Sequence, residues 1–394
     1  MFTKFLTPYK NLSKEIWILT LMTLINRAGA MVIPFLSLYL TKSMGFSLSP
    51  QVTVIMVFYG LGSLVGSWVG GKLTDKIGYH KVMYVSLFIS GFLFVGIQFL
   101  ETFMQFAIGI FILTAITDLF RPAIYVAMSS YSNEDNRTRS IALVRIAINL
   151  GYAVGPAMAG LLIAKLSYSW LFWIDGLTAI LASFIIYKFL FQKDIKKKET
   201  KEIKRDIVRP YKDVQFIIFW LVIFLCGVSF VQFIEVWPLF YDKIIHLNEQ
   251  EIGMILALNG FLIFILEMPI VSYVDKKFKH INLILFGLLL FALSFFVLTI
   301  NQSLTMVIIS MVLISIGEIF CFPFSNTYAL DLAKKGNEGE YMGFYTMTFA
   351  AAFLVAPLGL MIVQNYGFEI LWYAATVILI IGLLLTYIMK RKFK

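Results

Sequence analysis

Ionisable side chains interrupt the long apolar stretches of this 394-residue chain at nine positions. A charged side chain in the middle of a membrane-spanning helix costs about 2.5 to 3.5 kcal/mol, so each of these residues calls for a physical reason. Buried carboxylates can bind and release protons, and buried arginines can pair with them or hold an anion. The nine residues are Arg27, Asp118, Arg121, Arg145, Asp175, Glu235, Glu267, Glu318 and Asp331.

Three of these carboxylates lie in the second half of the chain, whose apolar stretches contain no Lys or Arg. A carboxylate that loses water without gaining a cation binds a proton more readily. We rank Glu318 first because it lies in the middle of its stretch. Glu235 lies among aromatic residues, which suits a cationic or amphipathic ligand, and Glu267 is interpreted as a gating carboxylate. For each of the three, the alternative is a protonated side chain hydrogen-bonded to a neighbouring helix.

The first half of the chain carries both signs of charge. Arg27 and Asp118 lie midway along two stretches, so they can reach a similar depth and form an ion pair. Arg121, one helical turn from Asp118, is an alternative partner. A static pair that only holds helices together is the competing interpretation. We expect proton coupling to involve Glu318, Glu235, Asp118 and Glu267.

Twelve apolar stretches of about 20 residues, the length that spans a bilayer, must position these side chains. Hydrophobic residues make up 60% of the chain and charged residues 14%, against about 25% charged residues in soluble domains. The stretches are continuous rather than alternating, which predicts α-helices and not a β-barrel. We place them near 15–41, 51–71, 81–100, 105–130, 138–164, 170–191, 214–241, 250–273, 280–300, 305–332, 340–364 and 369–389.

The two halves of the sequence repeat one another at an offset of 200 residues. Asp75 is echoed by Asp275, and Asp118 is echoed by Glu318. Duplicated halves are typical of secondary transporters. We therefore predict an all-α membrane protein with two pseudosymmetric six-helix halves, divided into an N-terminal bundle, a basic cytoplasmic linker and a C-terminal bundle at 1–190, 191–213 and 214–394.

The net charge of +10 reports orientation rather than nucleic-acid binding. Of the 33 Lys and Arg residues, only three lie in the odd-numbered loops, namely Lys42, Lys165 and Lys243. Cationic loops stay on the cytoplasmic side, so both termini are expected in the cytoplasm. The basic face would contact anionic membrane lipids. We expect no nucleic-acid partner.

Cysteine and histidine usage excludes several classes of site. The two cysteines, Cys226 and Cys321, lie inside apolar stretches, so packing is expected rather than a disulfide framework. Cysteines and histidines form no cluster, so we expect no metal site. No nucleophile–base pair or phosphate-binding loop is visible, so we expect neither a cofactor nor an enzyme or sensor.

Two motifs resemble known ones. The segment Gly71-Lys72-Leu73-Thr74-Asp75-Lys76-Ile77-Gly78-Tyr79-His80-Lys81 resembles the signature between the second and third helices of the major facilitator superfamily. The stretch from Arg145 to Pro156, with Gly151 and Gly155, is similar to the glycine–proline motif of the proton-coupled drug antiporters in that superfamily. The resemblance covers nearly the whole chain and implies the twelve-helix fold of that family.

Two positions depart from the family pattern. Tyr79 stands where an arginine is usual, and Ile110 stands where many antiporters carry an arginine in the fourth helix. We expect Asp118 and Arg121 to serve in place of that arginine. An aspartate just beyond a helix end can cap a neighbouring helix in one state only, which makes a gate. The alternative is that Asp75 only balances nearby lysines.

We assign the remaining polar and aromatic positions to two groups of residues. The gating motif comprises Gly71, Asp75, Lys76, Gly78, Lys81, Gly155, Pro156 and Asp275. The substrate cavity comprises Asn26, Arg27, Arg121, Arg145, Asn149, Phe233, Trp237 and Tyr345. The many aromatic residues, 16% of the chain, favour a bulky apolar substrate over a sugar.

These observations predict a secondary active transporter of the bacterial inner membrane that works as a monomer. The favoured activity is proton-coupled export of small amphipathic or cationic compounds by alternating access, as in multidrug efflux. A proton symporter that imports a peptide or sugar, or a lipid flippase on the same fold, is the alternative. Accumulation of substrate with a proton gradient would reveal uptake.

Overall fold

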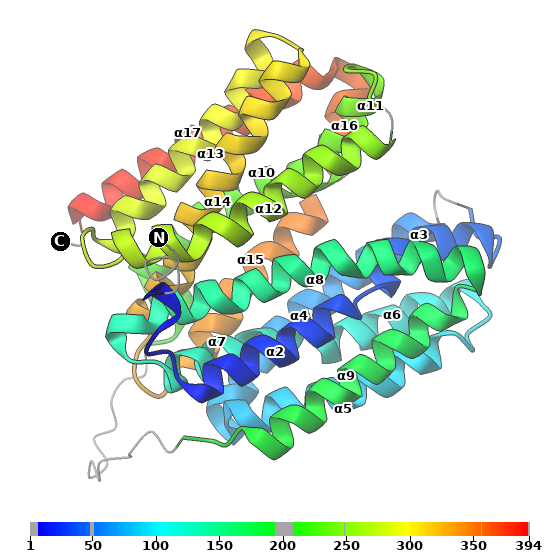
Figure 1. Ribbon diagram of the computed structural model, residues 1–394, viewed down its shortest axis with the longest axis horizontal. Helices are drawn as coiled ribbons and strands as arrows, with labels where there is room; N and C mark the ends of the chain where they lie inside the picture. The colour runs from blue at the N-terminus through cyan, green and yellow to red at the C-terminus, as the bar shows by residue number, and fades with distance from the viewer. Residues whose placement is uncertain (1–6, 48–50, 194–207, 248, 356, 393–394) are drawn as a thin grey trace. The chain divides into compact units, whose positions relative to one another are not determined.

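The computed structural model describes residues 7–47, 51–193, 208–247, 249–355 and 357–392. In these ranges every regular element is a helix (Figure 1). Most of the predicted linker at 191–213 lies outside the described residues. The helices are η1 (Thr7–Tyr9), α2 (Lys14–Ala28), α3 (Val32–Lys42), α4 (Thr53–Ile77), α5 (Tyr79–Ile97), α6 (Phe103–Asp118), α7 (Phe120–Tyr131), η3 (Glu134–Asn136), α8 (Arg137–Lys165), α9 (Ser169–Phe189), η4 (Pro210–Lys212), α10 (Val214–Glu235), α11 (Trp237–Lys243), α12 (Glu249–Val274), α13 (His280–Ile300), α14 (Leu304–Leu332), α15 (Glu338–Val355), α16 (Pro357–Tyr366) and α17 (Phe368–Lys392).

The predicted membrane-spanning stretches correspond to these helices. Ten described segments are long and apolar enough to cross a membrane, three of them made of two consecutive helices. The pair α2–α3 and the helix α8 occupy the first and fifth predicted stretches. The predicted twelve-helix membrane fold is therefore confirmed.

Several spans are interrupted at the positions that carry the charged residues. The fourth span breaks at Leu119 between α6 and α7, and the seventh breaks at Val236 between α10 and α11. Each break lies just before a proline, Pro122 or Pro238, which has no N–H for the carbonyl four residues earlier. The first span breaks after Gly29. Asp118 and Glu235 are thus the last residues of α6 and α10.

Contacts divide the chain into two compact units. Unit 1 comprises Met1–Lys10, Tyr211–Leu332 and Thr348–Lys394, and unit 2 comprises Asn11–Pro210 and Ala333–Met347. Unit 2 holds most of the first half of the chain and unit 1 most of the second half, with two short segments exchanged. The first ten residues belong with the C-terminal half, and the start of α15 belongs with the N-terminal half.

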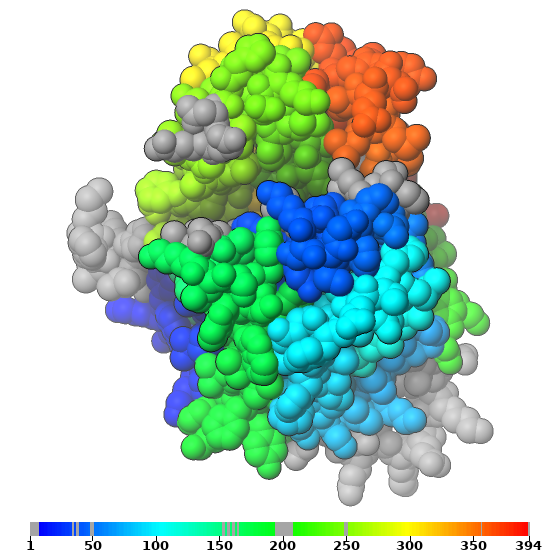
Figure 2. Space-filling view, turned by 90° about the vertical axis from the view of Figure 1, so that its right-hand side faces the viewer, coloured from blue at the N-terminus to red at the C-terminus, as the bar shows by residue number. Residues whose placement is uncertain are grey.

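In unit 2 the most extensive helix contacts join α4 to α6, α5 to α9, and α2 to α8. An apolar cluster fills one end of the unit. Tyr39 on α3 contacts Phe106 on α6 and Phe172 on α9, with ring centroids 6.1 and 5.0 Å away. Figure 2 shows this end, with α3 in blue between the cyan and green surfaces of neighbouring segments. The cluster fixes α3 against the rest of the unit.

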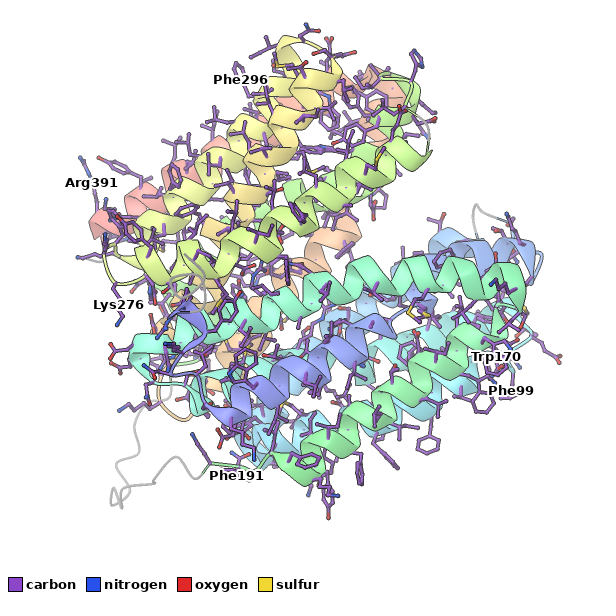
Figure 3. All side chains as sticks on the ribbon, viewed as in Figure 1. Phe99, Trp170, Phe191, Lys276, Phe296 and Arg391 are labelled. Carbon is purple, nitrogen blue, oxygen red and sulfur yellow. The ribbon has the colours of Figure 1, made fainter. Side chains whose placement is uncertain are left out.

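In unit 1 the core runs along α13, which packs on α14 and α17. Aromatic rings close one end of this core, where Trp237 stacks edge-on with Phe295 and Trp372 at 5.4 and 6.4 Å between centroids. Large apolar side chains also cover the outside of both units, as Phe99 and Phe296 illustrate (Figure 3). Such a surface is suited to lipid rather than water.

Close packing of α8 on α2 depends on Gly151. A Cβ atom added there would lie 2.9 Å from the carbonyl carbon of Arg27 and closer still to the Arg27 Cβ. Because backbone atoms cannot yield as a flexible side chain can, only glycine lets α8 approach α2 at this level. Gly155, one turn later, lies against the carbonyl oxygens of Arg27 and Ala28. The fifth-span glycines therefore set the position of Arg27.

We expect Gly151→Ala to lower the free energy of unfolding by about 1 to 3 kcal/mol, because the new methyl group must push α8 away from α2. Gly260→Ala in α12 is the matched control, since a Cβ there meets open space and alanine favours a helix. Thermal unfolding midpoints of the two purified variants check this. Equal midpoints would show that the two helices separate without cost.

Candidate functional site

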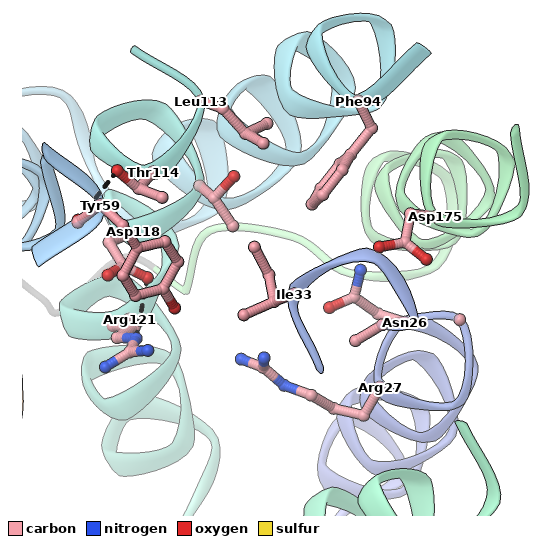
Figure 4. A pocket seen from close by; sticks show the side chains of 13 residues that line it. Asn26, Arg27, Ile33, Tyr59, Phe94, Leu113, Thr114, Asp118, Arg121 and Asp175 are labelled. Carbon is pink, nitrogen blue, oxygen red and sulfur yellow. Dashed lines mark hydrogen bonds and ion pairs between the residues drawn. The ribbon is translucent and has the colours of Figure 1, made fainter. Parts of the chain in front are cut away.

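A pocket of about 120 Å³ lies inside unit 2 (Figure 4). Three residues of the predicted cavity line it, namely Asn26, Arg27 and Arg121, and so does the predicted coupling residue Asp118. The remaining walls include Tyr59, Phe94, Leu113 and Asp175. In Figure 4, Arg27 and Asp175 approach from one side and Asp118 and Arg121 from the other. The pocket combines both signs of charge with aromatic rings.

Asp118 is buried and held from two helices. Arg121 Nε lies 2.8 Å from one carboxylate oxygen of Asp118, and the Ser63 hydroxyl on α4 donates to the other. Arg121 is the alternative partner that the sequence suggested. The Arg121 guanidinium therefore occupies one oxygen of this carboxylate inside the pocket.

Asp175 links two helices of unit 2. This buried carboxylate accepts hydrogen bonds from the backbone N–H groups of Met31 and Val32, at 2.8 and 3.1 Å. Those groups lie at the start of α3, where helix N–H groups have no partner within the helix. Asp175 therefore caps the second part of the broken first span from α9. Only the three-dimensional structure could show this, because 144 residues separate Asp175 from Met31.

Glu318 occupies the matching position in unit 1. It lies in the middle of α14, is 4% exposed, and one of its oxygens lies 3.4 Å from Asn259 Nδ2 on α12. The same Asn259 amide donates to Ser315 Oγ at 3.0 Å. Asn259 is a site residue that the sequence did not reveal. The helix that carries Glu318 contains no Lys or Arg.

The other two predicted coupling glutamates have different surroundings. Glu267 on α12 is completely buried. Its charge reaches Tyr9 of η1, where burial and, second, this charge raise the pKa of the phenol. Glu235 is exposed at the end of α10. The three glutamates thus lie on three different helices, α10, α12 and α14.

The other residues predicted to line the substrate cavity lie in three separate places. Phe233 and Trp237 contact each other with ring centroids 4.9 Å apart, within the aromatic core of unit 1. Tyr345 is buried and contacts Tyr125 edge-on in unit 2. Their assignment to a substrate cavity stays a prediction. Arg145 and Asn149 lie one turn apart on α8, on which Gly155 and Pro156 also lie.

Asp75 is the centre of the gating motif. Its two carboxylate oxygens accept hydrogen bonds from the backbone N–H groups of Gly339 and Glu340, at 2.6 and 2.7 Å. Asp75 therefore caps the start of α15, although it lies on α4. Gly71 makes this approach possible, because a Cβ there would lie 2.9 Å from Gly343 Cα.

The flanking residues of the motif lie at the surface or in the turn. Gly78 joins α4 to α5 with a φ of 90°, which favours glycine. Lys76 and Lys81 are exposed. His80 lies five residues after Asp75, and its Nε2 is 3.2 Å from the carbonyl oxygen of Ile186 on α9.

Asp275, the counterpart of Asp75 in unit 1, contacts a histidine side chain instead of a helix start. Asp275 lies 3.0 Å from Nε2 of His280, and the other ring nitrogen of His280 lies 3.3 Å from Asp331 at the end of α14. Two carboxylates accept only, so both ring nitrogens of His280 must donate, which requires the protonated imidazole.

Within the described ranges, no set of three or more His, Cys, Asp or Glu side chains is placed to hold a metal ion.

Comparisons with known proteins agree with this architecture. The sequence model of the Major Facilitator Superfamily matches residues 16–242 and 219–394. The chain is 28% identical to the uncharacterized MFS-type transporter YttB of Bacillus subtilis, over 96% of this chain and 95% of YttB. It is 24% identical to multidrug resistance protein 1 of the same organism, over 86% of this chain and 87% of that protein. The crystal structure of the human organic anion transporter MFSD10 superposes with a TM-score of 0.76 at 14% identity, over 95% of this chain and 100% of that one.

We expect Asp175→Ala to lower the free energy of unfolding by about 1 to 2 kcal/mol, because the α3 N–H groups lose their cap. Asp175→Asn should lose less, since the amide oxygen still accepts one of the two hydrogen bonds. The thermal unfolding midpoints of both variants show which of them loses more stability. An alanine variant as stable as the unchanged protein would show that water replaces the cap.

Proposed function

The chain belongs to the Major Facilitator Superfamily of membrane transporters, and we propose that it exports small amphipathic or cationic compounds in exchange for protons. Carriers of this family move small molecules and are not enzymes. The proposal specifies the driving ion, the direction and the class of substrate. It assumes alternating access, with the two six-helix repeats as the moving halves.

The observation that carries the proposal is a buried carboxylate at the equivalent position of each repeat. Asp118 ends α6 in unit 2, and Glu318 lies on α14 in unit 1. Each is contacted by a polar side chain of the second span of its half, which is Ser63 on α4 or Asn259 on α12. A protein that needs only packing has no reason to bury two such groups.

The two carboxylates have different surroundings. Asp118 has the Arg121 guanidinium at 2.8 Å, whereas Glu318 lies 3.4 Å from the Asn259 amide, in the middle of a helix whose own sequence has no Lys or Arg. A carboxylate buried in an apolar helix binds a proton more readily than one in water. A cationic substrate and a proton would compete for the same negative charge, and such mutual exclusion couples their movements. We therefore assign the main coupling role to Glu318, and secondary roles to Asp118 and Glu235.

The class of substrate rests on composition and on relatives. A relative of 24% identity is named a multidrug resistance protein, and the pocket in unit 2 offers the rings of Tyr59 and Phe94 beside its charged groups. Aromatic rings bind organic cations and apolar surfaces without demanding one shape. The distribution of Lys and Arg supports cytoplasmic termini, so the substrate would enter from the cytoplasm.

We propose that Asp75 gates this movement by exchanging caps on α15. The helix starts with Asn337-Glu338-Gly339-Glu340, and Asn337 with Glu340 three residues later is the pattern of a capping box. In the structure Asp75 holds the Glu340 N–H that the Asn337 side chain would otherwise bind. If Asp75 withdraws, Asn337 can take over. Because Asn337 then satisfies the Glu340 N–H, the exchange lowers the free energy needed to separate α4 from α15.

We expect Glu318→Gln to abolish proton movement that is triggered by substrate. In proteoliposomes with an internal pH dye and an imposed gradient, the unchanged protein should release protons when a cationic dye is added. The glutamine variant should not, because an amide cannot titrate. Glu369→Gln, at an exposed glutamate, is the matched control. If replacing Glu318, Glu235 and Asp118 together leaves transport coupled to the pH gradient, the proposal is wrong.

The cap exchange predicts an interaction between two substitutions. Asn337→Ala should cost little in the unchanged protein, because Asp75 holds the cap. In the Asp75→Ala background the same change should cost about 1 kcal/mol, because the capping box is then in use. Unfolding free energies of the four proteins give this difference. If Asn337→Ala lowers the unfolding free energy equally with and without Asp75, the exchange of caps is excluded.

A further inference from the structure

A second pocket of about 430 Å³ opens in unit 2 beside the start of α15. Three cationic side chains line it, Lys72 and Lys76 from α4 and Arg209 from the segment before η4, together with the carboxylates of Asp75 and Glu340. The Lys72 ammonium lies 3.6 Å from the centre of the exposed Trp68 ring. The cations outnumber the carboxylates, so the pocket favours an anion.

Two buried polar atoms in this pocket have no hydrogen-bond partner. They are Nδ2 of Asn337, a donor, and Oε1 of Glu340, an acceptor. The two residues are 7% and 9% exposed. Buried polar atoms are nearly always satisfied, so a donor and an acceptor left together call for a ligand. In a capping box the Glu340 carboxylate would accept from the Asn337 backbone N–H, but that N–H donates to the Lys334 carbonyl oxygen at 2.9 Å.

We propose that this pocket binds a phosphate monoester group. Its oxygens would accept from Lys72, Lys76, Arg209 and the Asn337 amide, as phosphate does at helix starts and basic clusters. Near neutral pH a phosphate monoester with a second pKa of about 6 still keeps one proton in part of the population. That O–H is the donor that Glu340 lacks. Sulfate and phosphodiesters carry no such proton.

The ligand would stabilise one arrangement of the gate. Lys72 and Lys76 lie on α4 with Asp75, whereas Asn337 and Glu340 belong to the start of α15. A single phosphate that contacts both would hold α4 against α15 while Asp75 caps it. Binding to one arrangement and not the other shifts the population toward the bound one. This site lies apart from the pocket of Asp118 and does not depend on the proposed proton exchange.

The first test uses the purified full-length protein in detergent, with inorganic phosphate and sulfate at equal ionic strength. Calorimetric titration should show phosphate binding at least about tenfold tighter than sulfate, because only phosphate satisfies Glu340. Phosphate should also raise the thermal unfolding midpoint in a dose-dependent way. Equal binding of the two anions overturns the proposal, and so does binding of neither anion when phosphatidic acid in nanodiscs gives no protection either.

Variants separate the specific site from general charge. Glu340→Gln should bind phosphate and sulfate equally, because its amide N–H can donate to either anion. Asn337→Ala should weaken phosphate binding about tenfold. Lys76→Gln should weaken it as well, whereas Lys335→Gln, an exposed lysine outside the pocket, is the matched control. A Glu340→Gln variant that still prefers phosphate contradicts the role of the carboxylate.

The source of the phosphate group is tested with lipid. Nanodiscs that contain phosphatidic acid, a monoester, should protect the protein against thermal unfolding more than nanodiscs with phosphatidylglycerol, a diester. Protection by phosphatidic acid without binding of inorganic phosphate assigns the site to a lipid headgroup, and the reverse assigns it to a soluble phosphate. Equal protection by the two lipids, together with equal binding of phosphate and sulfate, leaves only charge attraction and refutes the site.

Discussion

The need to satisfy every backbone N–H and C=O in an apolar environment governs this structure. A helix does this for its own residues but not at its ends, so each interruption inside a span creates groups that need outside partners. The first span is broken after Gly29, and Asp175 supplies the missing acceptors for α3. Asp75 does the same for α15. The charged residues of unit 2 are therefore placed largely by helix ends.

The same constraint explains why polar residues collect where spans break. Proline at 122 and 238 interrupts the fourth and seventh spans, and Asp118 and Glu235 stand at those points. A side chain at a break can reach across to another helix, as Asp118 does to Ser63. Glu318 lies inside an unbroken helix even though Pro323 follows it. The two repeats have thus kept the carboxylate but changed the backbone around it.

Much of the fold could be predicted from the sequence, because membrane helices are specified by length and composition along a single segment. The twelve spans followed from length and composition, and the duplication followed from residues that recur at an offset of 200. Three kinds of feature did not. The contact of Asp118 with Ser63 and the partners of Asp175 and Asp75 depend on contacts between distant segments. The breaks depend on whether a proline bends a helix or ends it. Asn259 drew no attention because a neutral amide in a long apolar stretch costs little on hydropathy scales.

His80 and His280 stand at equivalent places in the two repeats but have different surroundings. One contacts a backbone carbonyl on α9, and the other bridges Asp275 and Asp331. The bridge requires both ring nitrogens of His280 to donate, so it holds α13 to the end of α14 only while that ring is protonated. The second repeat therefore contains a helix contact that is lost when the ring loses its proton.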